Sequence, residues 1–540
     1  MATPLYAWNL RSSGRRVLEL PELARIICST LDQKLYVHLL YVSRNVYASV
    51  LPMIWEVALP KSVLLLIPGI EITDHIKFPS VIDLTRLSLH APFVKTLNAA
   101  TLEGLSASGE WPEVISKSIL PNLQRLVLSK LDGDGVDWIS RFLSPSLQML
   151  DMDPGNGEED SEDDTGKFPW LTLDTYTALF NLLSLNCPLI RTLRVSPVSG
   201  DIFKEELCGE AFNRLSNMSS LQSVTLVISC ITGELIRALS QLPRLTELSF
   251  WTSGVTTMFV QSTLEIPNDS FLSLKRLSMI DLGQDSIKHI CTVRPLFRNL
   301  TQADIIYNTR IYFTDSGNYK RSVLAVASLG QNTPQLQELA IHPRGWDLGG
   351  FVVSLPVINA FKHMHLRRLS LGSISFKRDY CPYESIGPGD GDEITESDSP
   401  ELQWTAFLGS IPRVEELHLE FQNIVSDRLA WFASLLPKLR LFVFRAIDLG
   451  EAPEVPNDKT GAAHPITIRT WSCFATEGSH WQETYVPDEH GLSNAARYIH
   501  DLWPKAKVKG MDDRIGRDRP DEGTIARLDV ALALSRSADK

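Results

Sequence analysis

A triplet of apolar residues with the spacing L-x-x-L-x-L recurs along most of the chain. Its clearest copy is Leu242–Phe250, which follows the helical-looking segment Gly233–Gln241. Because side chains alternate between the two faces of a strand, the spacing predicts short strands with one apolar face. The triplets open at Leu84, Leu123, Leu147, Ile190, Leu221, Leu245, Leu274, Leu300, Leu336, Leu366, Val414 and Leu439.

Helical segments separate nearly all of these predicted strands, for example Thr175–Leu185 and Asp427–Leu436. One helix–strand unit cannot bury its own apolar face, so units of this kind stack into a solenoid. Within the strands, we expect Leu248 and Leu339 to point inward and the residues before them, Glu247 and Glu338, to point outward. The pattern predicts an α/β fold in which helices cover one face of a parallel sheet and the other face is exposed and curved.

This periodicity resembles that of leucine-rich-repeat proteins, and we assign residues 59–473 to such a solenoid, with the horseshoe form of that family. The Asn or Cys that the family places three residues after the triplet is present here only at Asn308. We therefore expect irregular turns and uneven curvature. A weaker repeat with Ile468, Trp471 and Cys473 is predicted to end the sheet.

The period changes in the segment 17–58. Leu20, Leu23, Ile27 and Leu31 would share one face of a first helix, and residues 35–46 carry a second apolar face at Leu35, Leu39, Val42 and Val46. Leu51-Pro52 is predicted to break the chain before a third short helix at Ile54-Trp55. About forty residues cannot hide this much apolar surface internally, so another surface must cover it.

The segment 17–58 resembles an F-box, and leucine-rich repeats often follow that module in fungal-type members of the family. The matching positions are Leu20–Leu23, Ile26-Ile27, Leu31-Asp32, Val42–Arg44, and Leu51-Pro52 with Trp55; the family's usual Cys-Arg-x-Trp is replaced by Ser43–Val46. The resemblance implies that the module binds a Skp-family adaptor and, through it, a cullin. The implied adaptor-binding residues are Leu20, Pro21, Leu23, Ile27, Leu31, Leu35, Leu39, Val42, Leu51, Pro52 and Trp55. The alternative is a plain helical cap over the first repeat.

The charge balance restricts the class of partner. The 540 residues include 52 Lys and Arg against 64 Asp and Glu, a formal net charge of −12. This balance argues against a general nucleic-acid binder and favours a basic protein partner. Seven scattered cysteines indicate reduced thiols in a cytoplasmic or nuclear protein. The apolar run Val63–Ile67 is too short to cross a membrane, so no membrane partner is predicted.

The two longest gaps between triplets both contain acidic insertions, near residues 154–168 and 376–400, with cores at Gly157–Thr165 and Gly387–Ser399. Each follows a predicted strand, so both should lie on one rim of the solenoid. Such charge runs are usually solvated loops, and the exposed sheet face is an alternative binding surface. The candidate substrate-binding residues are Glu158, Glu159, Asp160, Glu162, Asp163 and Asp164 on the rim, and Arg125, Gln337, Arg367 and Arg368 on the sheet.

Motifs of catalysis are absent from the sequence: there is no phosphate-binding loop, no G-x-S-x-G elbow and no H-E-x-x-H. His363 and His365 have no further ligand at metal-binding spacing. We therefore expect no catalytic residues, no metal and no cofactor. The remaining segments are a leader over 1–16, a capping segment over 474–510, and a charged tail over 511–540 that could contain a short helix at Ile525–Leu534.

The resemblances together predict a substrate-recruiting subunit of a cullin–RING ubiquitin ligase of the SCF type. The F-box-like module would bind the adaptor, the solenoid would bind an unidentified protein substrate, and the partner enzyme would supply the chemistry. The alternative is a free-standing leucine-rich-repeat scaffold whose N-terminal helices only cap the first repeat.

Overall fold

The structure of the protein is a computed structural model. It describes residues 20–31, 33–41, 44–73, 76–99, 111–112, 115, 118–128, 135–152, 173–195, 205–227, 231–251, 266–280, 282, 287, 290–308, 326–344, 351–372, 374–376, 400–448, 464–476, 484–485, 489–510 and 522–538. The chain divides into two compact units, Met1–Leu248 with Val260–Leu264 and Ser249–Phe259 with Glu265–Lys540, which we call unit 1 and unit 2.

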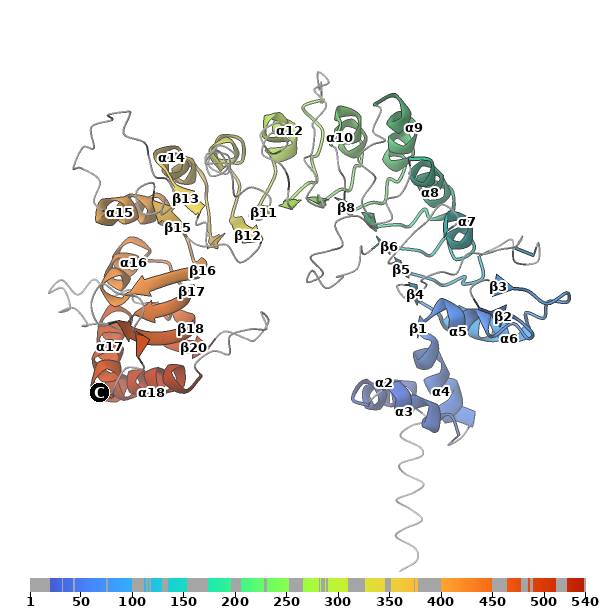
Figure 1. Cartoon of the computed structure of the whole chain (residues 1–540), viewed down its shortest axis with the longest axis horizontal. Coiled ribbons are helices and arrows are strands. Elements are labelled where there is room, and N and C mark those ends of the chain that lie inside the picture. Colours follow the sequence, from blue (N-terminus) through green and yellow to red (C-terminus); the bar gives the residue numbers. More distant parts are fainter. Residues whose placement is uncertain are drawn as a thin grey trace, which may run out of the picture. The chain divides into compact units, whose positions relative to one another are not determined.

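Unit 1 begins with three helices and continues as a parallel sheet whose strands run in the order β1-β4-β5-β6-β7-β8, followed by the start of β9. Helices α7, α8 and α9 lie along one side of these strands (Figure 1). The elements are α2 (Pro21–Ser29), α3 (Gln33–Leu39), α4 (Arg44–Trp55), β1 (Val57–Ala58), α5 (Pro60–Leu64), β2 (Glu71–Ile72), β3 (Ile76–Lys77), α6 (Thr85–His90), η1 (Ala91–Phe93), β4 (Thr96–Ala99), β5 (Arg125–Leu128), α7 (Gly135–Ser140), β6 (Met149–Met152), α8 (Leu173–Asn186), β7 (Thr192–Val195), α9 (Glu205–Ser216), β8 (Ser223–Val227), α10 (Gly233–Ser240) and β9 (Glu247–Trp251).

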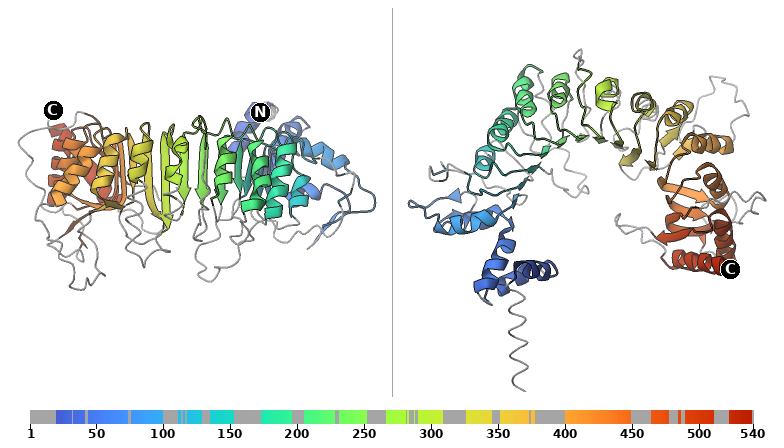
Figure 2. Two further views of the ribbon diagram at one scale, coloured as in Figure 1. Left: turned by 90° about the horizontal axis from the view of Figure 1, so that it is seen from above. Right: turned by 180° about the vertical axis from the view of Figure 1, so that it is seen from behind.

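Unit 2 contains a second run of parallel strands, β10-β11-β12-β14-β16-β17-β18, with β20 paired to β18. Helices α15, α16 and α17 line one side of this sheet, as Figure 2 shows from a second direction. The elements are β10 (Arg276–Ile280), α12 (Arg294–Phe297), β11 (Gln302–Asn308), β12 (Glu338–Arg344), β13 (Phe351–Val353), α14 (Leu355–His363), β14 (Arg368–Leu371), β15 (Ile374–Phe376), α15 (Pro400–Ser410), β16 (Glu416–Val425), η3 (Ser426–Arg428), α16 (Leu429–Leu435), β17 (Leu441–Asp448), β18 (Thr467–Thr476), β19 (Thr484–Tyr485), α17 (Glu489–Leu502), β20 (Lys507–Gly510) and α18 (Glu522–Ala538).

The strands bury the residues that the triplet pattern assigns to the core. Leu248 and Leu339 are each only 1% exposed, whereas Glu247 is exposed and Glu338 half-buried. Their neighbours across the sheet keep the same register, since Leu339 pairs with Ala303 on one side and Leu369 on the other. The predicted inward and outward positions are therefore confirmed at these strands. We call the sheet surface opposite the helices the open face.

Most strands are entered through the same turn, in which a buried residue is often followed by proline. The N–H of Leu123 donates to the carbonyl of Leu120 at 3.2 Å, and the N–H of Leu439 donates to that of Leu436 at 3.1 Å. Proline at the second turn position, as at Pro121 and Pro437, fixes φ at the value that this turn needs. The turn ends each helical segment and sets the chain direction for the strand.

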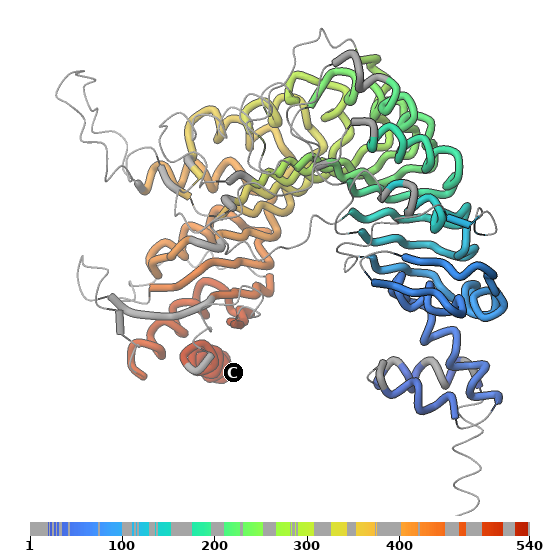
Figure 3. The backbone as a smooth tube through the Cα atoms, turned by 45° about the vertical axis from the view of Figure 1, so that its right-hand side comes forward, coloured from blue at the N-terminus to red at the C-terminus, as the bar shows by residue number. Residues whose placement is uncertain are grey.

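A ladder of backbone hydrogen bonds joins neighbouring repeats at the start of their strands. The carbonyl of Gln337 accepts the N–H groups of Arg367 at 2.7 Å and Arg368 at 3.0 Å. The carbonyl of Arg367 accepts those of Glu415 and Glu416 in the same way. This ladder uses only main-chain atoms, so it holds the strands in register whatever the side chains at these positions are. The smooth path of successive strands within each unit is visible in Figure 3.

The triplet at Leu84 is not a strand. Residues Thr85–His90 form helix α6, and the strand of this repeat is β4, which is entered through the turn from Ala91 to Val94. The prediction failed because residues three apart lie on one side of a helix as readily as they fit the triplet. The core positions are instead Val94, Leu97 and Ala99, all at most 4% exposed.

The prediction for the final repeat was wrong in register and in extent. Ile468 pairs with Phe442, so it occupies the middle position of its triplet and does not open it. The sheet continues beyond β18 to β20, which is entered through the turn from Trp503 to Ala506. This turn repeats the proline pattern, but β20 has few aliphatic residues and therefore gave no triplet. The 474–510 segment is thus partly strand.

Two helical predictions also needed correction. Pro52 does not break the chain, because helix α4 runs without interruption from Arg44 to Trp55. Buried Val50 and Leu51 pack just before the proline, and this tertiary contact overrides its poor helix propensity. At the other end, α18 covers Glu522–Ala538 and is longer than the predicted Ile525–Leu534. The long parallel sheets with covering helices fit a leucine-rich-repeat solenoid.

Candidate binding surfaces

The helices α2, α3 and α4 form a small core of their own. Cys28, Val46 and Val50 are completely buried at its centre, and Tyr36 and Leu39 pack against them. The Tyr36 hydroxyl also donates to the carbonyl of Cys28 at 2.5 Å, which joins α3 to the end of α2. Three helices held this way leave most of their remaining apolar side chains outside the core.

Several residues that the resemblance assigns to adaptor binding lie on this outer surface. Leu20 is 52% exposed, Leu35 46% and Leu23 36%. Ile27, Leu31, Leu39, Pro52 and Trp55 are half-buried, whereas Leu51 is buried at 6%. Pro21 opens helix α2, and Val42 lies outside the described residues.

Further apolar side chains of the module are exposed beyond the predicted set. Ile26 is 61% exposed and Tyr41 85%, and Val37 and Tyr47 are also exposed. We call Leu20, Leu23, Ile26, Leu35, Val37, Tyr41 and Tyr47 the apolar module surface. Ile26 belongs to the F-box-like pattern but was not among the predicted contact residues, although its neighbour Ile27 was.

The last helix of the module joins the first repeat directly. Helix α4 ends at Trp55, a single residue separates it from β1, and β1 pairs in parallel with β4. The Trp55 ring stacks on His90 with ring centroids 4.9 Å apart, and burial lowers the pKa of that histidine. The Glu56 carboxylate pairs with Lys95 at 3.1 Å. Trp55 therefore contacts the repeats, so it is only partly available to another protein.

On the open face of unit 1, the predicted residue Arg125 belongs to a charged triad. Its Nη2 lies 3.2 Å from Oδ2 of Asp151, and Nη1 of Arg194 lies 3.8 Å from Oδ1. The three residues come from adjacent strands β5, β6 and β7, and Asp151 is only 8% exposed. Because Asp151 engages Arg125, this arginine is tied to the fold and is less available to a ligand.

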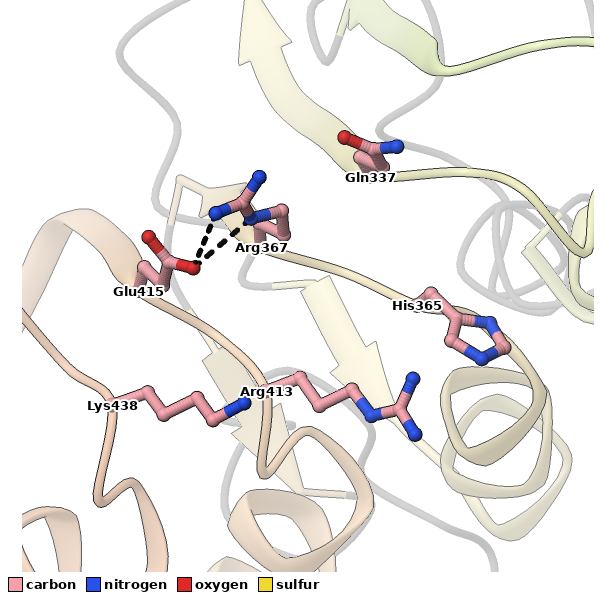
Figure 4. A pocket seen from close by; sticks show the side chains of 6 residues that line it. All are labelled: Gln337, His365, Arg367, Arg413, Glu415 and Lys438. Carbon is pink, nitrogen blue, oxygen red and sulfur yellow. Dashed lines mark hydrogen bonds and ion pairs between the residues drawn. The ribbon is translucent and has the colours of Figure 1, made fainter.

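In unit 2, a cleft of about 310 Å³ opens where β12, β14 and β16 begin. It is lined by Gln337, His365, Arg367, Arg413, Glu415 and Lys438. Figure 4 shows Arg367 held against Glu415, with Arg413 and Lys438 reaching across the neighbouring turns. Nε and Nη2 of Arg367 donate to one Glu415 oxygen at 3.0 and 2.8 Å. Bonding to Arg367 lowers the pKa of the Glu415 carboxyl, so it is ionised at neutral pH.

The structure thus brings together three of the four predicted sheet residues. Gln337 and Arg367 line the cleft, Arg368 follows directly on β14, and Arg125 lies in unit 1. His365, Arg413, Glu415 and Lys438 were not predicted as binding residues. A signal was available, because Arg413 and Lys438 each follow the turn proline and directly precede a triplet.

The predicted acidic rim cannot be placed. Glu158, Glu159, Asp160, Glu162, Asp163 and Asp164 lie outside the described residues, as do all residues of the second insertion from 377 to 399. The described part of the chain contains no cluster of His, Cys, Asp or Glu side chains that could hold a metal ion. In that same part, no helix is long and apolar enough to cross a bilayer. Cys28, Cys187 and Cys291 are free thiols, and burial raises the pKa of Cys187 and Cys291 to about 12.

No known family model matches this chain, and no curated protein does. Among solved structures, the chain is similar to an internalin from Listeria monocytogenes, with 14% sequence identity and a TM-score of 0.35. The alignment covers 80% of this chain and 90% of the internalin. At this level of similarity the comparison indicates no activity and no partner, and the repeat architecture rests on the strands and turns described above.

Proposed function

We propose that the chain is a substrate-recruiting subunit of an SCF-type cullin–RING ubiquitin ligase in the cytoplasm or nucleus. The module of α2, α3 and α4 binds a Skp-family adaptor, and the repeats bind a protein substrate. The chain itself has no catalytic role in this proposal. It holds the substrate near an activated partner, which replaces a bimolecular encounter by a local one.

The observation that carries the proposal is the apolar module surface. A cap would need apolar residues only where it meets the first repeat, and α4 already supplies that contact through Trp55. Yet Leu20, which directly precedes α2, Ile26 on α2 and Leu35 on α3 are each about half exposed or more. Exposed apolar surface of this extent on a small folded module supports a protein-binding role. The F-box-like sequence pattern includes Leu20 and Ile26.

The test is the binding of a purified Skp-family adaptor to the full chain, measured by isothermal titration calorimetry. Anchors at the centre of an interface are worth about 2 kcal/mol each, or about 30-fold in affinity. We therefore expect Leu20→Ala combined with Leu35→Ala to abolish measurable binding. The matched control is Val530→Ala with Leu534→Ala, which removes two apolar side chains of α18 that are at least as exposed as Leu20 and Leu35 and should leave adaptor binding unchanged.

A free-standing scaffold is the second candidate, and the stacking of Trp55 on His90 favours it because a cap requires this contact. Absence of adaptor binding by the wild-type chain would support the scaffold. Adaptor binding that is equally strong in the Leu20 and Leu35 variant would show that the module surface is not the adaptor site. Circular dichroism of each variant checks that the repeats remain folded.

A further inference from the structure

The open face of unit 2 and its rim carry a concentration of basic side chains. From β14 to β20, the strands and the turns before them present ten exposed arginines and lysines. At these positions, the acids whose side chains the structure describes are Glu415, Glu416 and Asp448, and Asp448 is buried at 5%. The ten residues, which we call the cationic face, are Arg367, Arg368, Arg413, Lys438, Arg440, Arg445, Arg469, Lys505, Lys507 and Lys509.

The register of the sheet places these residues beside one another. Thr467 of β18 pairs with Lys507 of β20, and Arg469 pairs with Lys509. Val508 lies between Lys507 and Lys509 on β20 and is buried at 3%. Because side chains alternate along a strand, both lysines point to the open face. At the rim, Arg413 and Lys438 line the same cleft as Arg367. Neighbouring strands are about 4.8 Å apart, so four strand intervals from β14 to β20 span about 19 Å.

Internal carboxylates compensate only a small part of this charge. Arg367 pairs with Glu415 at 2.8 Å and Arg368 with Glu416 at 3.5 Å. Within the described part of the chain, the other eight members make no ion pair and no side-chain hydrogen bond. Like charges held this close repel one another, so an anionic ligand would bind here with a favourable change in electrostatic energy.

We propose that the cationic face binds an acidic segment, rich in Asp and Glu, of the protein substrate. The basic residues are spread over five strands, which suits a run of carboxylates better than a single charged group. An extended peptide of roughly six residues covers about 19 Å. The Arg367–Glu415 pair shows that a carboxylate can bind to an arginine side chain in the cleft. A single-stranded nucleic acid is the competing anionic ligand, and its binding is one of the outcomes of the test below.

This inference rests on the proposed function only for the premise that the ligand is a protein, and it reverses the basic partner expected from the net charge. The net charge sums the whole chain, whereas a ligand responds to the local field. The inference is tested without any adaptor, so its failure and a failure of adaptor binding are separate results.

The experiment measures fluorescence anisotropy of a labelled peptide of about eight glutamates, a length that covers the face, titrated with the full-length chain. A glutamine peptide of the same length is the neutral probe. A glutamine peptide with one phosphoserine and a single-stranded oligonucleotide are the competing anions. We expect the glutamate peptide to bind, the glutamine peptide not to bind, and the affinity to fall as salt rises from about 0.05 to about 0.3 M.

Charge reversal locates the site. Arg413→Glu with Lys438→Glu should weaken glutamate-peptide binding by about tenfold or more, because both residues line the cleft. Lys362→Glu with Arg497→Glu makes the same change in net charge at exposed positions of helices α14 and α17 and should leave binding within about twofold of wild type.

Equal loss in both variants would overturn the proposal, since the effect would then be one of total charge. Binding of the phosphoserine peptide or the oligonucleotide more tightly than the glutamate peptide would also overturn it, and so would binding that does not respond to salt. Circular dichroism confirms that the variants are folded.

Discussion

His418 should make unit 2 sensitive to mild acid. It lies on β16 with its side chain 13% exposed, and its Nε2 is buried without a hydrogen-bond partner. Burial, reinforced by the nearby positive charges of Arg368, His342 and Arg469, lowers its pKa from 6.5 to about 4. His418 is therefore neutral at pH 7, and its 3.9 Å approach to Glu416 is not an ion pair under those conditions.

The sign of the effect follows from proton binding. Between pH 6.5 and about 4, the unfolded chain protonates this histidine and the folded chain does not. The free energy of unfolding therefore falls as the pH is lowered through this window, by about 1.4 kcal/mol per pH unit. A difference of about 2.5 pKa units corresponds to a loss of roughly 3 kcal/mol by pH 4. Above pH 6.5 the imidazole is mostly neutral in both the folded and the unfolded chain, so none of this stability is lost.

The assay is unfolding of the full chain in urea at several pH values. Hydrogen exchange of the β16 and β17 amides is the readout, so that the unfolding of unit 2 is measured by itself. His418→Gln removes the titrating group and should flatten the dependence between pH 6.5 and 4. His363→Gln, which removes an exposed histidine from α14, is the matched control and should leave the slope as in wild type. If His418→Gln lost stability in parallel with wild type over this window, the assigned burial of the imidazole would be wrong.

Two further pairs of substitutions test the core and the charged triad. Leu339→Ala should reduce the free energy of unfolding by about 2–5 kcal/mol, because Leu339 is 1% exposed; Glu338→Ala should change it by about 0.5 kcal/mol at most, and reversed costs in urea unfolding would mean that the strand register is off by one. Asp151→Asn leaves Arg125 and Arg194 facing each other without their shared carboxylate. Since these arginine side chains are 48% and 34% exposed, solvent screening reduces the cost to about 1–3 kcal/mol. Arg125→Gln should cost less, because Arg194 still compensates Asp151, and a larger loss for Arg125→Gln in thermal unfolding would contradict this account.

The sequence by itself determined the repeating unit. Alternation within each triplet places Leu248 and Leu339 in the core, since a strand has only two faces and only one is covered by helices. The turn prolines also mark where strands begin, as Pro121 and Pro437 show. Both signals are local, so they can be recognised without knowing what packs against them.

Local signals failed where two structures share one pattern. Leu84 and Leu87 fit a triplet and a helix equally well, and only the pairing of β4 with β1 and β5 decided the assignment. The same applies to β20, whose Lys507 and Lys509 conceal a strand that is visible only from its pairing with β18. In each case the neighbouring strand supplies the missing constraint.

The binding surfaces depended on tertiary structure for a different reason. Arg367, Arg413 and Lys438 belong to three different repeats, and they share a cleft only because the backbone ladder holds those repeats in register. The net charge of −12 predicted a basic partner, but a sum over the chain contains no information about position. A ligand responds to charges within roughly 8 Å under physiological salt. That short range is why the fold, and not the composition, decides what this surface attracts.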